Sequence, residues 1–411
     1  MEIAATAAAQ ETHRTGRQER WLVFALAGIQ FSHILDFMVV MPLGPVLMEA
    51  LAIDARQFAL LVSIYTLAAA GSGLAAAGFI DLFGRKGLLL GLFALFCLAT
   101  LACGLAPDYS TLLLARALAG AFGGVLAAML QTVIGDAIPF ERRARASGAV
   151  MAATSLAGVL GVPLSLLVAA TFGWQWPFVA IAAVAALFWA LAARHVPRLP
   201  RHPAGPRPFA GMAAVLRERN HWVALLFMAL GAFSTFTVMP YLTLHLVRNV
   251  GLGVGDMPLI YALGGLGGFL GARWIGGLAD RAGKARIYRL AGLLSIPAIL
   301  LQTHLPALAL GWVLPCAMVF LTLMPARAVP AMAIAISAVP PPVRGTFLSL
   351  SAAVQQLACS AAAYAGGLLI AEAADGTLSG YGTAGWLAAA LTGATVLLAG
   401  RIRMHVRPPG A

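Results

Sequence analysis

The sequence has few charged residues. Of its 411 residues, 10% are charged and 61% are hydrophobic. A soluble domain of average composition has roughly a quarter charged residues, so this chain cannot cover a water-facing surface with charge. The sequence also has only four cysteines, all within apolar segments and without metal-ligand spacing. It has no GxxxxGK[ST] phosphate-binding loop and no cluster of nucleophiles or metal ligands, so we expect no enzyme, no metal and no cofactor.

Long apolar runs take the place of charge. Residues 87–106 and 177–193 contain no charged side chain, and about 20 such residues form a helix that crosses the hydrocarbon core of a bilayer. The sequence therefore predicts an all-α integral membrane protein with about twelve transmembrane helices, arranged as two pseudo-symmetric six-helix bundles. The predicted spans are 21–48, 58–80, 87–106, 110–135, 145–171, 177–193, 221–247, 257–279, 287–304, 307–338, 345–371 and 383–400.

A polar segment divides the chain into halves. The run RHVPRLPRHPAGPRP follows the sixth predicted span and is rich in proline, arginine and histidine. Proline removes backbone donors and keeps such a segment extended, so it is typical of a linker. The predicted order is a cytoplasmic N-terminal segment, a six-helix bundle, a cytoplasmic linker, a second six-helix bundle and a cytoplasmic tail. Their residues are 1–20, 21–193, 194–220, 221–400 and 401–411.

The formal net charge of +12 follows from the orientation of the chain. Nearly all lysines and arginines lie in alternate loops, which include the linker and both ends, while Arg56 and Arg248 fall on the other side. Cytoplasmic loops carry an excess of Lys and Arg, so we expect both termini in the cytoplasm and a multi-pass protein of the cell's inner membrane. The partner of this basic protein is the lipid bilayer, and no nucleic acid is expected. The polar segment 1–20 is followed by a long span without a small-residue cleavage pattern, so we expect no cleaved signal peptide.

The two halves repeat one loop motif. A glycine, an acid, a second glycine and a basic residue follow the second predicted helix, and the same order follows the eighth. The residues are Gly78, Asp81, Gly84, Arg85 and Lys86 in the first copy and Gly277, Asp280, Gly283 and Lys284 in the second. A short acid can bond free backbone N–H groups at a helix end, and glycine permits the turn. We expect both loops to act as gate latches; the alternative is a pair of cytoplasmic anchors that only set topology.

These loops resemble the signature loop of the major facilitator superfamily. Asp36 followed by Met41-Pro42 resembles the first-helix motif of its twelve-helix drug:proton antiporter branch. The segment 114–120 resembles the Arg motif of the fourth helix in that branch, and 158–163 resembles the antiporter motif of the fifth. Within the branch the sequence is similar to arabinose-efflux permeases. The resemblance implies a monomer that transports by alternating access, with its substrate site between the halves, near the membrane midplane.

Asp36 is the one carboxylate predicted deep within a span. It lies about fifteen residues into the first helix, near the midplane on the ideal helical rise. A charge at that depth costs several kcal/mol unless it is hydrated, paired or neutralised. Gln30, His33 and Asp36 are spaced by three, so they share one helical face and predict a polar cavity wall. We expect Asp36 to carry protons or to recognise a cation; the alternative is a structural, hydrogen-bonded aspartate.

Arg116 and Arg327 are two further charges predicted within spans. The resemblance implies that Arg116 assists Asp36 in proton coupling, while the alternative is a structural or snorkelling arginine. Arg327 lies between two prolines, which free backbone carbonyls where a helix lines a cavity, and we expect it to contact an anionic or hydroxylated substrate. Ser234 stands where the seventh helix would mirror Asp36, so both Ser234 and Arg327 are predicted to line the substrate cavity.

The fifth helix contains residues suited to close packing. Gly158 and Gly161 allow another helix to approach, and Pro163 can bend its own helix. Packing alone explains these residues, and a role in preventing proton leak is implied by the resemblance only.

The sequence thus predicts a secondary active transporter that exports a small organic solute, such as a drug, sugar or metabolite, by proton antiport. Val162 separates Gly161 from Pro163 in the fifth-helix motif, and this departure leaves room for a proton-coupled importer. An uncoupled facilitator, with a structural Asp36, is a third possibility. A membrane receptor or assembly factor that kept the fold without transport belongs to another class, in which two gate loops have no obvious use.

Overall fold

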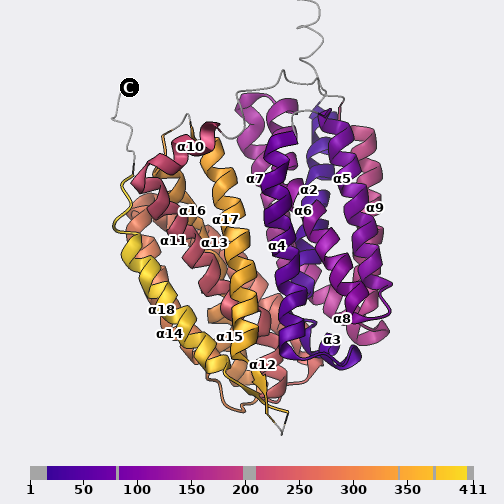
Figure 1. Ribbon diagram of the computed structural model, residues 1–411, viewed down its shortest axis with the longest axis vertical. Helices are drawn as coiled ribbons and strands as arrows, with labels where there is room; N and C mark the ends of the chain where they lie inside the picture. Colours follow the sequence, from indigo (N-terminus) through magenta and orange to yellow (C-terminus); the bar gives the residue numbers. More distant parts are fainter. Residues whose placement is uncertain (1–15, 80–82, 198–209, 341–342, 374–375, 405–411) are drawn as a thin grey trace, which may run out of the picture.

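The computed structural model describes residues 16–79, 83–197, 210–340, 343–373 and 376–404, which form two bundles of long helices (Figure 1). The N-terminal bundle contains α2 (Gly16–Val39), α3 (Gly44–Ala50), α4 (Ala55–Phe79), α5 (Arg85–Gly104), α6 (Tyr109–Ala137), α7 (Phe140–Leu156), the π-helix η2 (Ala157–Gly161), α8 (Val162–Phe172) and α9 (Gln175–His195). The C-terminal bundle contains α11 (Arg219–Val238), η3 (Met239–Tyr241), α12 (Leu242–Arg248), η4 (Val254–Asp256), α13 (Met257–Ala282), α14 (Lys284–Thr303), α15 (Leu310–Ala326), α16 (Ala328–Ser337), α17 (Arg344–Leu369) and α18 (Tyr381–Leu398). Three further elements are the short helix α10 (Ala210–Arg217) and the antiparallel strands β1 (Ala371–Glu372) and β2 (Leu378–Ser379).

The prediction of an all-α membrane protein is confirmed. Within the described residues, 11 helical segments are long and apolar enough to cross a membrane. In hydrocarbon every backbone N–H and C=O must find its partner inside the protein, and a helix satisfies them locally. The helix α14 also has 20 residues, but it is not among the eleven because Lys284, Arg286 and Arg289 lower the hydropathy of its start.

The first helices of the two bundles are interrupted at equivalent prolines. The helix α2 ends at Val39, two residues before Met41-Pro42, and α3 begins at Gly44. In the second bundle, α11 ends at Val238 and the 3₁₀ turn η3 contains Met239-Pro240 before α12. Proline lacks a backbone donor and clashes with the preceding turn, so each segment that the sequence predicts as a single span becomes a long helix followed by a short one.

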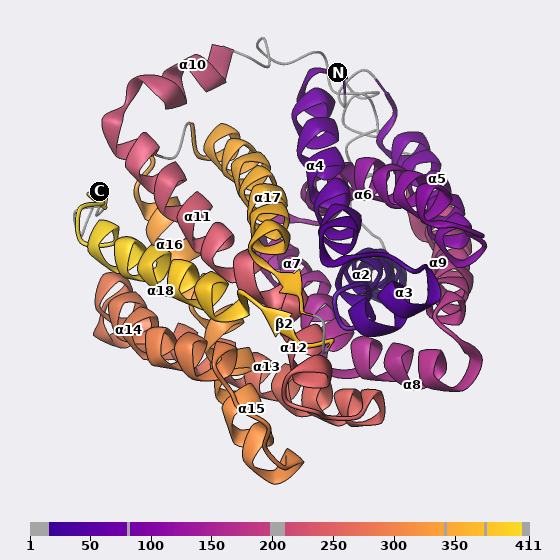
Figure 2. The same ribbon diagram turned by 60° about the horizontal axis from the view of Figure 1, so that its bottom comes forward.

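The two ends of the molecule carry different elements. The upper end in Figure 1 contains α10, the start of α2 and the last described residues, and we call it the linker end. The lower end contains α3, α12 and the β1–β2 pair, and we call it the hairpin end. Figure 2, in which the hairpin end comes forward, shows the two bundles side by side around it.

The two bundles pack against each other through α4 with α17, α13 with η2 and α8, and α3 with α12. The close contacts that define this interface lie toward the hairpin end. The Ser360 hydroxyl of α17 donates to the Ser63 carbonyl of α4 at 3.0 Å, and a Cβ added to Gly367 would lie 2.3 Å from the Cβ of Ala59. At the linker end the ribbons of the two bundles diverge (Figure 1).

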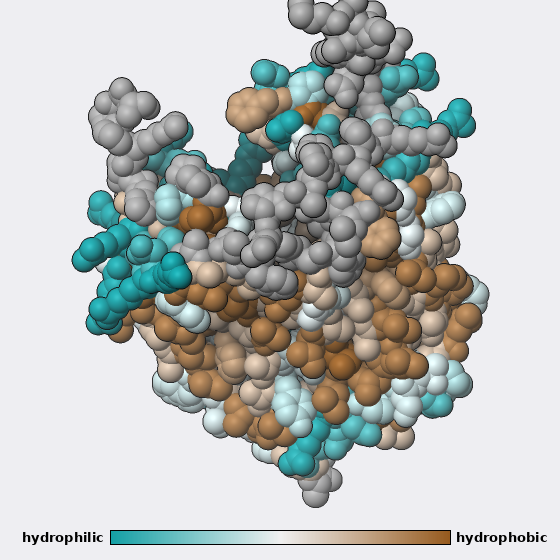
Figure 3. Space-filling model, turned by 45° about the horizontal axis from the view of Figure 1, so that its top comes forward, coloured by the Kyte–Doolittle hydropathy of each residue, from teal (hydrophilic) through white to brown (hydrophobic). Residues whose placement is uncertain are grey.

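The outer surface has a band of apolar side chains. Figure 3 shows hydrophobic residues around the middle of the visible face and hydrophilic residues above and below them. Large apolar residues such as Leu114, Trp274 and Leu397 are exposed. An apolar band of this kind faces lipid.

Candidate functional site

A buried ion pair joins the first and fourth spans. A guanidinium nitrogen of Arg116, on α6, donates to Asp36 Oδ2 at 2.9 Å and to the Asp36 backbone carbonyl at 3.1 Å. The two side chains are 0% and 1% exposed for Asp36 and Arg116 respectively. Asp36 Oδ1 and Arg116 Nε form no hydrogen bond among the described residues. Each charge therefore depends on the other, because a buried charge without its partner is expensive.

A row of aromatic rings leads from this ion pair to the other bundle. The Arg116 guanidinium lies 4.5 Å from the centre of the Tyr65 ring, within the range of a cation–π contact. Tyr65 packs on Phe37, with ring centres 5.2 Å apart, and Phe37 stacks on Phe236 of α11 at 5.8 Å. The ion pair of the N-terminal bundle is thus connected to a helix of the C-terminal bundle through three rings.

The predicted ribbon of Gln30, His33 and Asp36 faces the interior of the N-terminal bundle, where all three residues are buried. The Gln30 amide donates to the Thr154 hydroxyl of α7 at 3.2 Å. The His33 ring lies among aromatic rings, 6.0 Å from Phe96 between centres. Each of the three residues thus contacts a different neighbouring helix, and their role in a substrate cavity stays a prediction.

Arg327 is the buried cation of the C-terminal bundle, with 3% of its surface exposed. It lies at the junction of α15 and α16, and it donates to three hydroxyls. These are Thr392 at 2.8 Å, Thr235 at 2.9 Å and Ser234 at 3.3 Å. No carboxylate pairs with Arg327 in the described part of the chain. The structure therefore brings Arg327 and Ser234 together, with a positive charge balanced by neutral dipoles alone.

The described residues of both predicted gate loops lie at the linker end (Figure 1). In the first copy Asp81 lies outside the described residues, Gly78 belongs to the last turns of α4, and Gly84 precedes α5. Arg85 Nε donates to Asp136 Oδ2 of α6 at 3.3 Å, and Lys86 donates to the Ala193 carbonyl of α9 at 2.7 Å. The first-copy basic residues thus tie the start of α5 to neighbours in its own bundle.

The second copy has an equivalent arrangement. Gly277 and Asp280 belong to the last turns of α13, and Gly283 has a φ of 95°, which favours glycine. The Lys284 ammonium donates to the Ser337 hydroxyl of α16 at 3.1 Å. Whether either copy acts as a gate latch stays a prediction.

The fifth-span glycines lie at two helix contacts. Gly158 is within η2, and a Cβ added to Gly265 of α13 would lie 2.7 Å from the Gly158 carbonyl oxygen. A Cβ added to Gly161 would lie 2.7 Å from a Leu35 methyl carbon. Pro163 lies in the first turn of α8, directly after η2. The π-helical stretch thus lies against α13 of the other bundle.

Two polar contacts of the site were missed by sequence reasoning. Thr154 binds Gln30, and Thr392 binds Arg327, but each is a hydroxyl within an apolar span. Such hydroxyls most often bond to their own helix, as Thr392 also does with the Ala388 carbonyl. A hydroxyl residue within a predicted span can therefore be assigned to a site only when the helix that it contacts is known.

Comparison with known proteins identifies the family. The sequence model of the Major Facilitator Superfamily matches residues 26–363. The chain is 29% identical over 208 residues to inner membrane transport protein YdhP of Escherichia coli (strain K12), covering 48% of this chain and 50% of that protein. It is 30% identical over 186 residues to a probable sugar efflux transporter of Pasteurella multocida, covering 45% and 46% of the two chains. The chain thus spans about half the length of these relatives.

Solved structures show the same fold. A bacterial homolog of the human lysosomal transporter Spinster, in an inward-facing and occupied conformation, aligns with a TM-score of 0.75 and 18% identity over 97% of this chain and 100% of that one. The nucleoside transporter NupG aligns with a TM-score of 0.71 and 14% identity over 93% of this chain and 99% of that one. With two helical bundles, apolar spans and a family match over most of its length, this chain is a multi-pass membrane protein and belongs to the Major Facilitator Superfamily.

Proposed function

We propose that the protein is a secondary active transporter that exports a small organic solute in exchange for protons. The observation that carries the proposal is the Asp36–Arg116 ion pair, which is fully buried between the last turn of α2 and the first part of α6. An ion pair in hydrocarbon is retained at a cost, so a charged pair at this depth suggests a functional role. Protonation of Asp36 would neutralise its carboxylate and release Arg116 from a 2.9 Å contact.

The row of aromatic rings connects Arg116 to the C-terminal bundle, so it would transmit a structural change that follows protonation of Asp36. Movement of Arg116 would change its contact with Tyr65, and Tyr65 packs on Phe37, which touches Phe236 of α11. Phe236 follows Thr235, a partner of Arg327, along α11. A change of charge at Asp36 would therefore alter the packing of α11, whose Ser234 and Thr235 hydroxyls bind Arg327. This connection supports coupling between the two bundles.

The contacts between the bundles support transport by alternating access. They lie toward the hairpin end, where Gly367 meets Ala59 and Ser360 binds Ser63. We assign the linker end to the cytoplasm because basic residues begin the helices there, and cytoplasmic ends carry the excess of Lys and Arg. The described conformation then corresponds to one closed toward the outside of an inner membrane. We further propose that a single chain contains all the transport machinery.

Arg327 supports a substrate that carries an anionic or hydroxyl group. Its guanidinium is held by three hydroxyls and by no carboxylate of the described residues. A substrate oxygen would therefore meet a cation whose charge is still uncompensated. The relative named as a probable sugar efflux transporter is consistent with an exported solute rich in hydroxyl groups.

The test is transport by proteoliposomes with an imposed pH gradient. Purified protein is reconstituted, the lumen is made acidic, and uptake of labelled sugars, antibiotics and dyes is followed. An antiporter takes up its substrate as protons leave, and one proton moving through about 100 mV supports a gradient of roughly fifty-fold. The control is Asp54→Asn, because Asp54 is exposed and, within the described residues, its carboxylate accepts a hydrogen bond only from the Gln57 N–H at the start of α4.

The direction of the gradient separates the rival functions. Accumulation only when the outside is acidic would instead identify an importer driven by proton symport. Equilibration without accumulation under either gradient would identify an uncoupled facilitator. No movement of any solute, together with unchanged protease accessibility when solutes are added, would favour a receptor or assembly factor and would contradict the proposal.

A further inference from the structure

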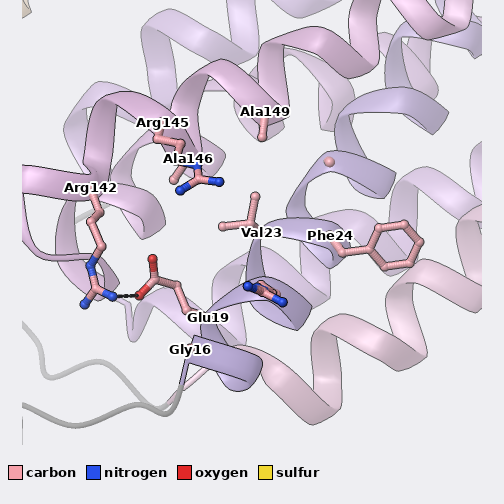
Figure 4. Close-up of a pocket in the computed structure, with 10 residues that line it drawn as sticks. Gly16, Glu19, Val23, Phe24, Arg142, Arg145, Ala146 and Ala149 are labelled. Atoms are coloured by element: carbon pink, nitrogen blue, oxygen red, sulfur yellow. Dashed lines mark ion pairs between the residues drawn. The ribbon is translucent and has the colours of Figure 1, made fainter.

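A groove with a basic mouth lies on the side of the N-terminal bundle, away from the ion pair. It has a volume of about 510 Å³ and is formed by α2 and α7 at their linker ends (Figure 4). Gly16, Arg20, Val23 and Ala27 of α2 line it, and their spacing of four, three and four residues places them on one helical face. The opposite face of α2 carries Leu22, Leu26 and Ile29 into the bundle core.

The contacts of α2 show that this groove opens to the side of the bundle. On one flank, Glu19 pairs with Arg142 of α7 at 3.0 Å. On the other flank, Phe24 packs on Phe188 of α9, with ring centres 5.5 Å apart, and Trp21 stacks on His195. The lining face of α2 lies between these two flanks. It is therefore directed outward between α7 and α9, where a membrane protein meets lipid.

The mouth of the groove carries an excess of positive charge. Arg20, Arg142 and Arg145 line it, together with the single acid Glu19. Arg142 is paired with Glu19, whereas Arg20 and Arg145 form no ion pair in the described part of the chain. In Figure 4 the Arg145 guanidinium points into the space between α7 and Val23. Two arginines are thus available to a phosphate, to which a guanidinium can donate two parallel hydrogen bonds.

The inner part of the groove is apolar. Val23 and Ala27 continue from Arg20 along α2, and Ala146 and Ala149 face them from α7. On the ideal helical rise, Ala27 lies about 10 Å deeper along α2 than Arg20. Trp21 is partly exposed beside the arginine, and exposed tryptophans mark the level of the lipid headgroups. The basic mouth and the apolar wall therefore match a headgroup and an acyl chain in order of depth.

We propose that this groove binds one anionic phospholipid of the cytoplasmic leaflet, with its phosphate on Arg20 and Arg145 and an acyl chain along Val23, Ala27 and Ala149. Basic pockets between transmembrane helices at the cytoplasmic side suit such headgroups. The lipid would bridge α2 and α7 at the point where the Glu19–Arg142 ion pair also joins them.

The proposal is tested by titrating the purified, delipidated full chain with dioctanoyl phosphatidylglycerol and counting bound lipid by native mass spectrometry. We expect one tight site, with phosphatidylglycerol bound at least tenfold more tightly than dioctanoyl phosphatidylcholine. Each arginine near an anionic surface contributes a roughly fivefold change in affinity, so R20Q/R145Q should weaken binding about thirtyfold. Arg145→Lys should retain most of the affinity. The matched control is Arg17→Gln, since Arg17 is exposed on the same helix and does not line the groove.

A second variant tests the apolar wall without changing charge. Ala149→Phe would fill the groove, so it should weaken phosphatidylglycerol binding while both arginines remain. Equal binding by the native protein and R20Q/R145Q would overturn the proposal, as would equal affinity for phosphatidylcholine. If inorganic phosphate displaced phosphatidylglycerol at millimolar concentration, the groove would be a site for a free anion and the lipid assignment would be wrong.

Discussion

Removing either charge of the Asp36–Arg116 ion pair should destabilise the protein strongly. Removing both charges should destabilise it much less than the sum of the two single losses. Both side chains are inaccessible to solvent, and their contact is 2.9 Å long. Removing one partner of such a pair leaves a buried charge, at a cost of about 3–5 kcal/mol. Asp36→Asn and Arg116→Gln should therefore each lower the free energy of unfolding by about that amount. The double variant contains two neutral amides at contact distance, so it should lose no more than the worse single variant.

The measurement is unfolding of the four proteins in mixed micelles by titration with a denaturing detergent, analysed as a double-mutant cycle. The control is Arg142→Gln, because the Arg142–Glu19 pair has a similar length but its arginine is 51% exposed. An exposed pair contributes about 1 kcal/mol or less. Additive losses in the double variant would refute the reasoning, as would single losses no larger than that of the control.

Three further predictions follow from other contacts. In Gly265→Ala the new Cβ would lie 2.7 Å from the Gly158 carbonyl oxygen of the other bundle, so distances between spin labels on the two bundles at the hairpin end should increase. The control is Gly71→Ala, whose Cβ would meet nothing within 4 Å, and it should leave those distances unchanged. Arg327→Gln removes a buried cation that has no carboxylate partner in the described residues. Transport should fall at least tenfold, while the free energy of unfolding should change by less than about 1 kcal/mol. A large loss of stability would show that Arg327 is structural. The Thr111 N–H donates to Asp108 at 2.8 Å and lowers the pKa of this exposed carboxyl at the start of α6. A lowered pKa gives stability that is present above the unfolded value near 4 and is lost as pH falls through the folded value. The protection factor of the Thr111 amide, which corrects for the slower intrinsic exchange in acid, should therefore fall as pH is lowered in the native protein but less in Asp108→Asn.

Hydropathy predicted where the chain crosses the membrane better than where its helices end. The sequence predicts a first span from residue 21, but α2 begins at Gly16, and it predicts a fifth span from 145, but α7 begins at Phe140. Backbone hydrogen bonding continues beyond the apolar core, so a helix extends into water without any apolar signal. In the basic mouth of the groove between α2 and α7, Arg20 and Arg142 lie in those two extensions, and Arg145 stands at the first residue of the predicted fifth span.

The ion pair and the Arg327 cluster differ in how far they could be predicted. Asp36 and Arg116 are predictable as site residues because charges within spans are rare, and the family resemblance links the two. Their distance could not be predicted, since 80 residues separate them and helix packing decides which faces meet. Thr392 could not be predicted as a partner of Arg327, because a threonine in an apolar span commonly bonds its own helix, as Thr392 does with the Ala388 carbonyl. Only the structure therefore shows that Arg327 is surrounded by neutral hydroxyl groups.

The measurement that tests the central claim most directly compares two transport modes of Asp36→Asn in proteoliposomes. Exchange of labelled for unlabelled substrate needs the alternating movement but no net proton transfer, whereas accumulation driven by a pH gradient needs both. If protons are coupled through Asp36, the variant should keep exchange and lose accumulation, while Asp54→Asn keeps both. Accumulation by Asp36→Asn at the native level would contradict the account and would leave the Asp36–Arg116 ion pair as a purely structural contact.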